Sequence, residues 1–439
     1  MEDFFQIDWS FIDRVGDNPF LAMWFFLANG GWIILLITMV WIAVKGWQHR
    51  NQNVFDRKRT FVVLSISVPR THEQGPRAVE NMFAYLAGAH SPPTWYENWF
   101  VGKTQDVISC EIVSTEGHVQ FIIRTTRAFR DLVEAAIYSQ YPDADIVEIE
   151  DYTKKLPHHF PDEEYDLWGI EMVPAGKSDV YPLKTYPYFE DKITMEFKDP
   201  MSALIESFGR AGPDEHIWYQ IILKPIDQKE FQKKGETLLK KLLGIKAPVH
   251  KSVIDHALDL PLKAGGMLLE GVLGGGGADV HAKPAEKVEA KIKNMTQGEK
   301  DVISAMENKL SKINYLCKMR FVYVAKKTAM NKAKVANPFV GSIKQFNTNH
   351  MLSLKPETKH VGVNGALWWF KDSRNNTRKN HLVHAYARRS GWAGAPAFHL
   401  CTEELATLWH FPHSIQVKAP QLQKTESKRS EPPRNLPFA

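Results

Sequence analysis

The chain has 439 residues, of which 44% are apolar and 24% are charged, and its formal net charge is +5. The apolar content is sufficient for folded cores, and the length predicts two or three domains. So small a net charge on so long a chain does not by itself indicate a nucleic-acid-binding protein.

An uncharged stretch of 25 residues, from Phe20 to Val44, is the first predicted element. As a helix it would be roughly 37 Å long, enough to cross a hydrocarbon core of about 30 Å. Residues 1–19 are mainly acidic, whereas residues 45–59 are mainly basic. Because lysine and arginine stay on the cytoplasmic side, we expect a single-pass protein of the cell membrane. Residues 1–19 would lie outside and the bulk of the chain in the cytoplasm.

A cleaved signal peptide is the alternative for this stretch. Signal peptides have a basic start, a shorter apolar core and a small-residue cleavage site. Here the start is acidic and the core is long, which favours an uncleaved anchor. The three cysteines, Cys110, Cys317 and Cys401, have no metal-ligand or redox spacing and agree with a reducing cytoplasm.

Residues 60–152 predict a ferredoxin-like β-α-β-β-α-β domain. Strands are expected at 61–68, 107–113, 119–125 and 144–150, with a hairpin turn at Glu116-Gly117. One helix is expected to begin at Pro76, and another after Thr126, whose side chain would cap it.

Residues 166–412 predict a second α+β domain, interrupted by a glycine-rich insertion at 247–294. Its expected strands are 167–173, 192–198, 217–223, 320–325 and 381–387. Its expected helices are 200–209, 228–245, 331–346 and 403–409, with one more after a capping box at Thr296 and Glu299. Residues 413–439 form a Pro-rich tail. No internal repeat is evident, and a degenerate duplication of one ferredoxin-like unit stays open.

Motifs for catalysis or cofactor binding are not evident in the sequence. The glycine run at 274–277 lacks the Lys-Ser/Thr of a phosphate-binding loop. His158-His159 lies in a Pro-bounded polar loop, and His381 and His384 would point to opposite faces of a strand. We therefore expect no cofactor, no metal and no enzymatic activity.

The stretch from Asn308 to Pro356 contains no acidic residue. Aromatic residues interleave with its lysines and arginine, a combination that suits phosphate contacts and base stacking as well as an anionic membrane. A solvated face or a protein contact is the third interpretation. The candidate contacts to nucleic acid or anionic lipid are Lys318, Arg320, Lys326, Lys327, Lys332 and Lys334.

Three groups of segments resemble one known family when taken in order. They are residues 109–113 with 121–123, 137–142 and 148–152; residues 218–225; and residues 402–412 with 432–437. Together they resemble the membrane-anchored region that precedes the motor domain in type IV secretion and conjugation-like ATPases of the coupling-protein and HerA type. In that family the Pro-rich segment leads into a P-loop ATPase, whereas this sequence stops at Ala439.

The resemblance implies a non-enzymatic, membrane-anchored component of a type IV secretion-like or DNA-transfer system, which tethers a separately encoded hexameric ATPase at the cytoplasmic face. Leu422, Leu436 and Phe438 would be the apolar contacts of the tail with that partner. The alternative is a membrane-associated nucleic-acid-binding module that uses residues 308–356. Membrane lipid, DNA and a second copy of the chain are the further candidate partners.

Overall fold

The computed structural model describes residues 20, 23–24, 27–69, 74–190, 198–243, 295–363 and 369–412. The chain divides into two compact units. Unit 1 comprises residues 1–60 and 91–105, and unit 2 comprises residues 61–90 and 106–439. The predicted strand at 192–198 lies almost wholly outside the described residues. The glycine-rich insertion lies outside them, as does the tail from residue 413.

Unit 1 is built around the long helix α3 (Trp32–Lys58), which follows a π-helical turn, η2 (Leu27–Gly31). Gly30 adopts a φ of +101° in this turn, a conformation that glycine reaches without steric cost. In its described part from Leu27 onward, the predicted helix over 20–44 is thus a π-helical turn followed by an α-helix. The α-helix begins at Trp32 and continues through the basic residues to Lys58. A second helical segment, η4 (Glu97–Val101), packs on α3.

The described strands of unit 2 form one antiparallel sheet with the order β4-β1-β3-β2-β6-β7-β5-β8, and β9 pairs with β7. The strands are β1 (Phe61–Ser67), β2 (Ile108–Thr115), β3 (His118–Thr126), β4 (Asp145–Glu148), β5 (Tyr165–Pro174), β6 (Glu215–Pro225), β7 (Asn314–Lys326), β8 (Leu354–Glu357) and β9 (Phe398–Cys401). The α+β class is thus confirmed, and strands of both predicted domains share one sheet.

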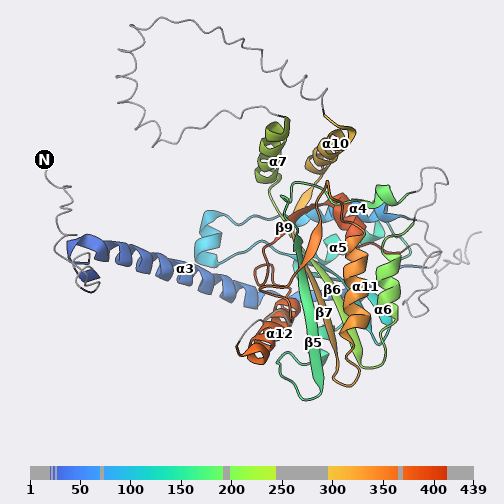
Figure 1. Ribbon diagram of the computed structural model, residues 1–439, viewed down its shortest axis with the longest axis horizontal. Coiled ribbons are helices and arrows are strands. Elements are labelled where there is room, and N and C mark those ends of the chain that lie inside the picture. The colour runs from blue at the N-terminus through green and yellow to red at the C-terminus, as the bar shows by residue number, and fades with distance from the viewer. Residues whose placement is uncertain are drawn as a thin grey trace, which may run out of the picture. The chain divides into compact units, whose positions relative to one another are not determined.

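The helices of unit 2 cover both faces of this sheet. They are α4 (Pro76–Leu86), α5 (Arg130–Tyr138), α6 (Ser202–Gly209), α7 (Gln228–Leu243), α10 (Gln297–Ser311), α11 (Lys332–Lys344), α12 (Lys371–Ala387) and α13 (Thr402–Leu408), with short 3-10 turns η3 (Ala87–Ala89), η5 (Arg127–Phe129), η6 (Tyr152–Lys155) and η7 (Tyr186–Phe189). Figure 1 shows α6 and α11 side by side on one face and α12 on the other.

A topological repeat organises the sheet. The elements β1-α4-β2-β3-α5-β4 recur in the same order as β5-α6-β6-β7-α11-β8. The strand orders are β4-β1-β3-β2 and β8-β5-β7-β6, and the two halves join through β2 and β6. The helix pairs correspond too, because α4 packs on α5 and α6 packs on α11. The segment containing α7 and α10 enters the second half between β6 and β7.

Local sequence signals account for several of these elements. Glu116 and Gly117 both adopt positive φ, as the type I′ turn of a two-residue hairpin requires. The predicted capping box at Thr296 and Glu299 begins α10 and is confirmed. The Thr126 cap is wrong: β3 extends through Thr126, a 3-10 turn follows, and the Thr126 hydroxyl makes no capping hydrogen bond.

The predicted strand at 381–387 is also wrong, because these residues form the end of α12. Leu382, Val383 and Tyr386 have the i, i+1, i+4 spacing of one helical face, and that face is buried against β5 and β7.

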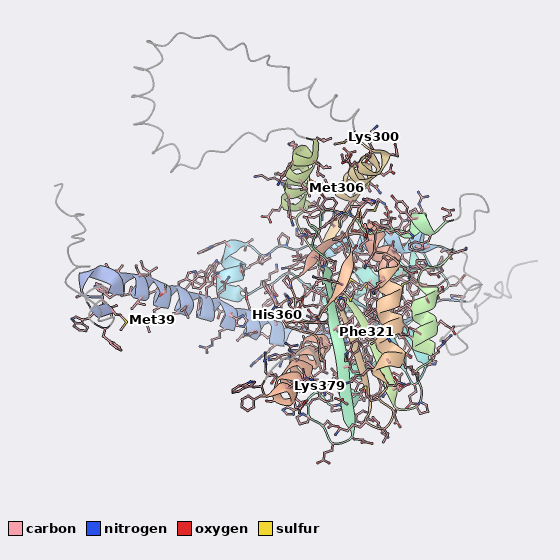
Figure 2. The ribbon with its side chains drawn as sticks, in the orientation of Figure 1. Met39, Lys300, Met306, Phe321, His360 and Lys379 are labelled. Atoms are coloured by element: carbon pink, nitrogen blue, oxygen red, sulfur yellow. The ribbon has the colours of Figure 1, made fainter. Side chains whose placement is uncertain are left out.

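Two large apolar clusters lie on opposite faces of the sheet. The larger cluster contains residues of α4, α5, α6, α11 and α13. On its sheet side Phe321 of β7 stacks on Phe339 of α11, with ring centroids 3.8 Å apart (Figure 2). The smaller lies under α12 and includes Trp218, stacked on Tyr386 at 5.2 Å. A third, small cluster joins α7 to α10 through Phe231 and Met306 (Figure 2).

Candidate functional site

A row of buried polar side chains crosses the middle of the sheet on the face covered by α12. Glu111, Gln220, Arg320 and Glu171 are direct neighbours in register on β2, β6, β7 and β5. Gln220 Nε2 donates to Glu111 Oε1 at 2.9 Å, and Arg320 Nε donates to Glu171 Oε1 at 2.7 Å. All four are at most 2% exposed, so the row lies within the protein interior.

Arg389, just after α12, closes this row at one end. It adopts a φ of +50°, is 1% exposed, and its Nε donates to Glu111 Oε1 at 2.9 Å. The same guanidinium pairs with Asp151. The Tyr152 hydroxyl donates to Glu111 Oε2 at 2.7 Å, and the Tyr386 hydroxyl lies 2.8 Å from that of Tyr152. The arginine thus joins the end of α12 to β2 and to the segment that follows β4, both in the first half of the sheet.

The loop after α12 is held by the other end of the row. Arg320 Nη2 donates to the Ala393 carbonyl at 2.6 Å, and Lys318 donates to the carbonyls of Trp392 and Ala393. The Ala395 N–H donates to Glu171. Lys318 and Arg320, two of the predicted contact residues, are therefore buried and engaged inside the fold.

The electrostatics of the row favour charged, paired groups. Burial by itself would raise the pKa of Glu111, but the Arg389 guanidinium outweighs it and holds this pKa below its usual value. Burial likewise opposes ionisation of Asp151, yet its hydrogen bond from Arg389 lowers the pKa. Burial raises the pKa of the Tyr152 and Tyr386 hydroxyls. At neutral pH Glu111 and Asp151 are thus ionised, and the row holds α12 and its loop in position.

A cavity of about 540 Å³ lies next to this row and shares Tyr152 with it. In register, His118 of β3, Thr115 of β2 and His216 of β6 are neighbours at its floor, and Trp218 and Lys155 also line it. Burial lowers the pKa of His216, so this imidazole is neutral at pH 7. The volume suits a small ligand or a side chain of a partner. Within the described residues, no group of three or more His, Cys, Asp or Glu side chains could hold a metal ion.

The remaining predicted basic contacts divide into two pairs. Lys326 forms ion pairs with Glu164 and Asp214, and Lys334 forms one with Glu215 at 2.6 Å. Lys327 and Lys332 line an open hollow of about 530 Å³, and neither is ion-paired with a described residue. The interleaved aromatics are all at most 2% exposed and cannot stack on bases here: Tyr315, Phe321, Tyr323, Phe339 and Phe346.

Binding of nucleic acid or anionic lipid stays a prediction, and the two lysine pairs offer its test. We expect Lys327→Gln with Lys332→Gln to weaken DNA binding and to reduce the slope of log K against log salt by about 2. The matched variant Lys326→Gln with Lys334→Gln should change the slope less, because carboxylates already neutralise those lysines. The measurement is a DNA titration at several salt concentrations, repeated with anionic vesicles. Equal slopes for both variants would contradict the assignment.

The last helix of the fold is fixed by ion pairs from α10 and the turn after it. Lys309 Nζ and Glu404 Oε2 are 2.8 Å apart and both groups are buried, while Lys312 pairs with Glu403 and with Glu80. Leu405, Leu408, Trp409 and Phe411 are at most 3% exposed, which confirms the prediction that they pack within this chain. The predicted partner contacts Leu422, Leu436 and Phe438 lie outside the described residues.

The sequence interpretation missed the buried row, although a signal was present. Glu111, Glu171, Gln220 and Arg320 each stand between two apolar residues of a strand. A charge in that position must be paired or hydrogen-bonded, since burying it alone is very unfavourable. The pattern therefore predicts that each of these side chains is buried and paired, but it does not predict the partner of any of them.

The fold defines an α+β protein with an apolar N-terminal helix and a large antiparallel sheet. Residues 64–424 match the family model of a domain of unknown function, DUF8128. This match covers more than half of the chain, and the protein therefore belongs to the DUF8128 family. No curated protein matches the sequence.

Proposed function

We propose that this protein is a single-pass membrane protein that holds a non-enzymatic assembly domain at the cytoplasmic face of the cell membrane. The observation that carries the proposal is the exposure of α3. Its large apolar side chains from Trp32 to Val44 are 41–75% exposed, and they lie on every side of the helix. A helix that is apolar all round requires an apolar environment, which a bilayer supplies. Within 18 residues of α3 the mean hydropathy reaches 1.3.

The orientation rests on the distribution of charge. The residues before Phe20 are mainly acidic, whereas Lys45, Arg50, Arg57, Lys58 and Arg59 follow the apolar part of α3. Positive residues remain in the cytoplasm, so unit 2 is placed there. The buried cysteines Cys110, Cys317 and Cys401 form no disulfide, in agreement with a reducing compartment.

The assembly role rests on the resemblance to the region that precedes the motor in type IV secretion and conjugation-like ATPases. The element order of each half of the sheet is that of the ferredoxin-like arrangement, and we propose that unit 2 is a pair of such units. The segments that carry the resemblance contribute Glu111, Gln220 and Trp409 to the interior. Ion pairs fix α13, so the described residues end on a firmly held element next to the tail that we propose as the contact with the partner. The proposed partner is a separately encoded hexameric P-loop ATPase.

Removal of residues 416–439 should abolish capture of this ATPase without releasing the chain from the membrane. The reason is that the proposed contacts with the partner, Leu422, Leu436 and Phe438, all lie within the removed residues. The measurement is a pull-down from detergent-solubilised membranes, with mass spectrometry to identify a P-loop protein. A full-length variant carrying Leu422→Ser, Leu436→Ser and Phe438→Ser is the matched control for tail length, and should lose the ATPase too. Undiminished capture by both variants would contradict tethering through the tail.

A further inference from the structure

Residues 91–105, which we call the aromatic segment, leave the sheet domain between α4 and β2 and dock on α3. Gln48 Nε2 and Gln52 Nε2 both donate to Asn98 Oδ1, at 3.3 and 3.2 Å. Asn51 Nδ2 donates to the Trp99 carbonyl at 3.1 Å, and Thr104 donates to Asp56. Asn98, the Trp99 carbonyl and Thr104 of the segment thus hydrogen-bond to the polar part of α3.

The segment is held rigidly in this position. Thr94 and Glu97 cap each other reciprocally, with the Thr94 N–H 2.8 Å from Glu97 Oε2. Gly102 ends the helical turn at a φ of +76°, and a Cβ there would lie 2.3 Å from the carbonyl carbon of Asn51. Only glycine permits so close an approach of the two backbones. The aromatic residues are therefore presented from a fixed support.

The opposite side of the segment exposes a compact group of aromatic rings. Trp95, Tyr96 and Phe100 are 70%, 61% and 51% exposed, although each packs on another ring. Tyr96 stacks on Phe100 at 5.0 Å, Trp95 meets Phe100 at 5.9 Å, and Trp47 of α3 meets Phe100 at 5.5 Å. An exposed apolar group of this kind marks an interaction surface.

The position of the segment along α3 indicates what the surface meets. Its contacts on α3 run from Lys45, which lies over the Trp99 ring at 5.0 Å, to Gln52 and beyond. They begin directly after Val44, where the apolar part of α3 ends. At 1.5 Å per residue, Gln48 lies roughly 6 Å along the helix from Val44, about the depth of one headgroup layer.

We propose that the aromatic segment lies in the headgroup region of the bilayer and anchors the chain there beside the basic end of α3. Tryptophan and tyrosine are enriched at this depth because an apolar ring with a polar edge suits the boundary. Lys45 and Arg50 of α3 add positive charge where anionic lipid headgroups lie, whereas Lys103 of the segment is paired with Glu97. This inference rests on the proposed membrane-spanning role of α3.

The test is spin-label accessibility in the full-length chain reconstituted in vesicles of mixed neutral and anionic phospholipid. Single variants Trp95→Cys, Met39→Cys and Trp392→Cys receive the label, since the three native cysteines are buried. Met39 is 75% exposed on the apolar part of α3 (Figure 2), and Trp392 is 81% exposed on unit 2. Collisions of the label with oxygen and with a water-soluble nickel chelate are measured for each variant.

We expect the label at position 95 to collide more with oxygen and less with nickel than the label at position 392, which is the signature of lipid. The label at position 39 should show the same change more strongly. Lipid exposure at 39 with full nickel access at 95 would overturn this inference and leave the proposed function intact. Low collision rates with both agents at 95 would indicate a protein contact instead and overturn it too. Nickel access at position 39 would contradict the proposed function itself.

Discussion

Arg389→Met should lower the free energy of unfolding of unit 2 by about 3–5 kcal/mol, because removing one partner of a buried ion pair leaves the other charge uncompensated. Arg389 pairs with Glu111 and Asp151, and both Arg389 and Glu111 are at most 1% exposed. Methionine approximates the length of the arginine side chain, so the variant tests the charge more than the volume. The measurement is denaturant unfolding of the full chain in detergent, followed by circular dichroism.

Arg388→Met is the matched control, since Arg388 is the preceding residue and is exposed. Its effect should stay within about 0.5 kcal/mol, as for most surface substitutions.

The pH dependence of the free energy of unfolding provides a second readout. In the native protein the pKa of Glu111 is lowered, so its contribution to stability is present above the unfolded value of about 4.3 and is lost as pH falls. Without Arg389 that carboxyl should be easier to protonate, and the deficit of the variant should shrink at acid pH. Equal losses for the two variants would refute the structural role of Arg389.

Trp409→Ala should lower the free energy of unfolding by about 3–5 kcal/mol, the usual effect of removing a large buried aromatic side chain. Trp409 is 0% exposed, and its ring meets Phe83, Phe121 and Phe411 with centroids 5.2–6.0 Å apart. Its Nε1 donates to the Glu111 carbonyl at 3.4 Å. The substitution therefore removes contacts among α4, β3 and the end of the fold, and thermal or denaturant unfolding measures the loss.

Trp392→Ala is the control for Trp409, because it removes the same side chain from a site that is 81% exposed. Within the described part of the chain, its ring lies under the Lys224 ammonium, 5.3 Å from the ring centroid. We expect an effect below about 1 kcal/mol, the size of an exposed cation–π contact. A large loss for Trp392→Ala, or a negligible one for Trp409→Ala, would show that α13 is not part of the core.

Much of the secondary structure could be predicted from local patterns. Three examples are the β-branched residues of β1, the two-residue turn after Thr115 and the capping box at Thr296. Each depends only on residues that are close together in the sequence. Residues 381–387 show the limit of this reasoning. Histidine and alanine between apolar residues resemble a strand, but packing against β5 and β7 selects a helix that extends back to Lys371.

The arrangement of the site could not be predicted, because it depends on residues that are far apart in sequence. Glu111 and Arg389 are 278 residues apart, and the pairing of β2 with β6 joins the strands of the two halves of the sheet. The topological repeat has no obvious counterpart in the sequence, since many apolar sequences satisfy the same strand pattern. For the basic stretch, the sequence shows which residues are charged but not which of them are exposed. The structure shows that Lys318 and Arg320 are buried.

The central claim is that α3 is an uncleaved anchor that holds unit 2 at the cytoplasmic face. Its most direct test is protease access to an epitope placed after Ala439, in carbonate-washed vesicles of either orientation. We expect the full-length chain to remain in the membrane pellet, and the epitope to be lost only from inside-out vesicles. Release by carbonate, a chain shortened at its N-terminus, or loss of the epitope from right-side-out vesicles would contradict the account.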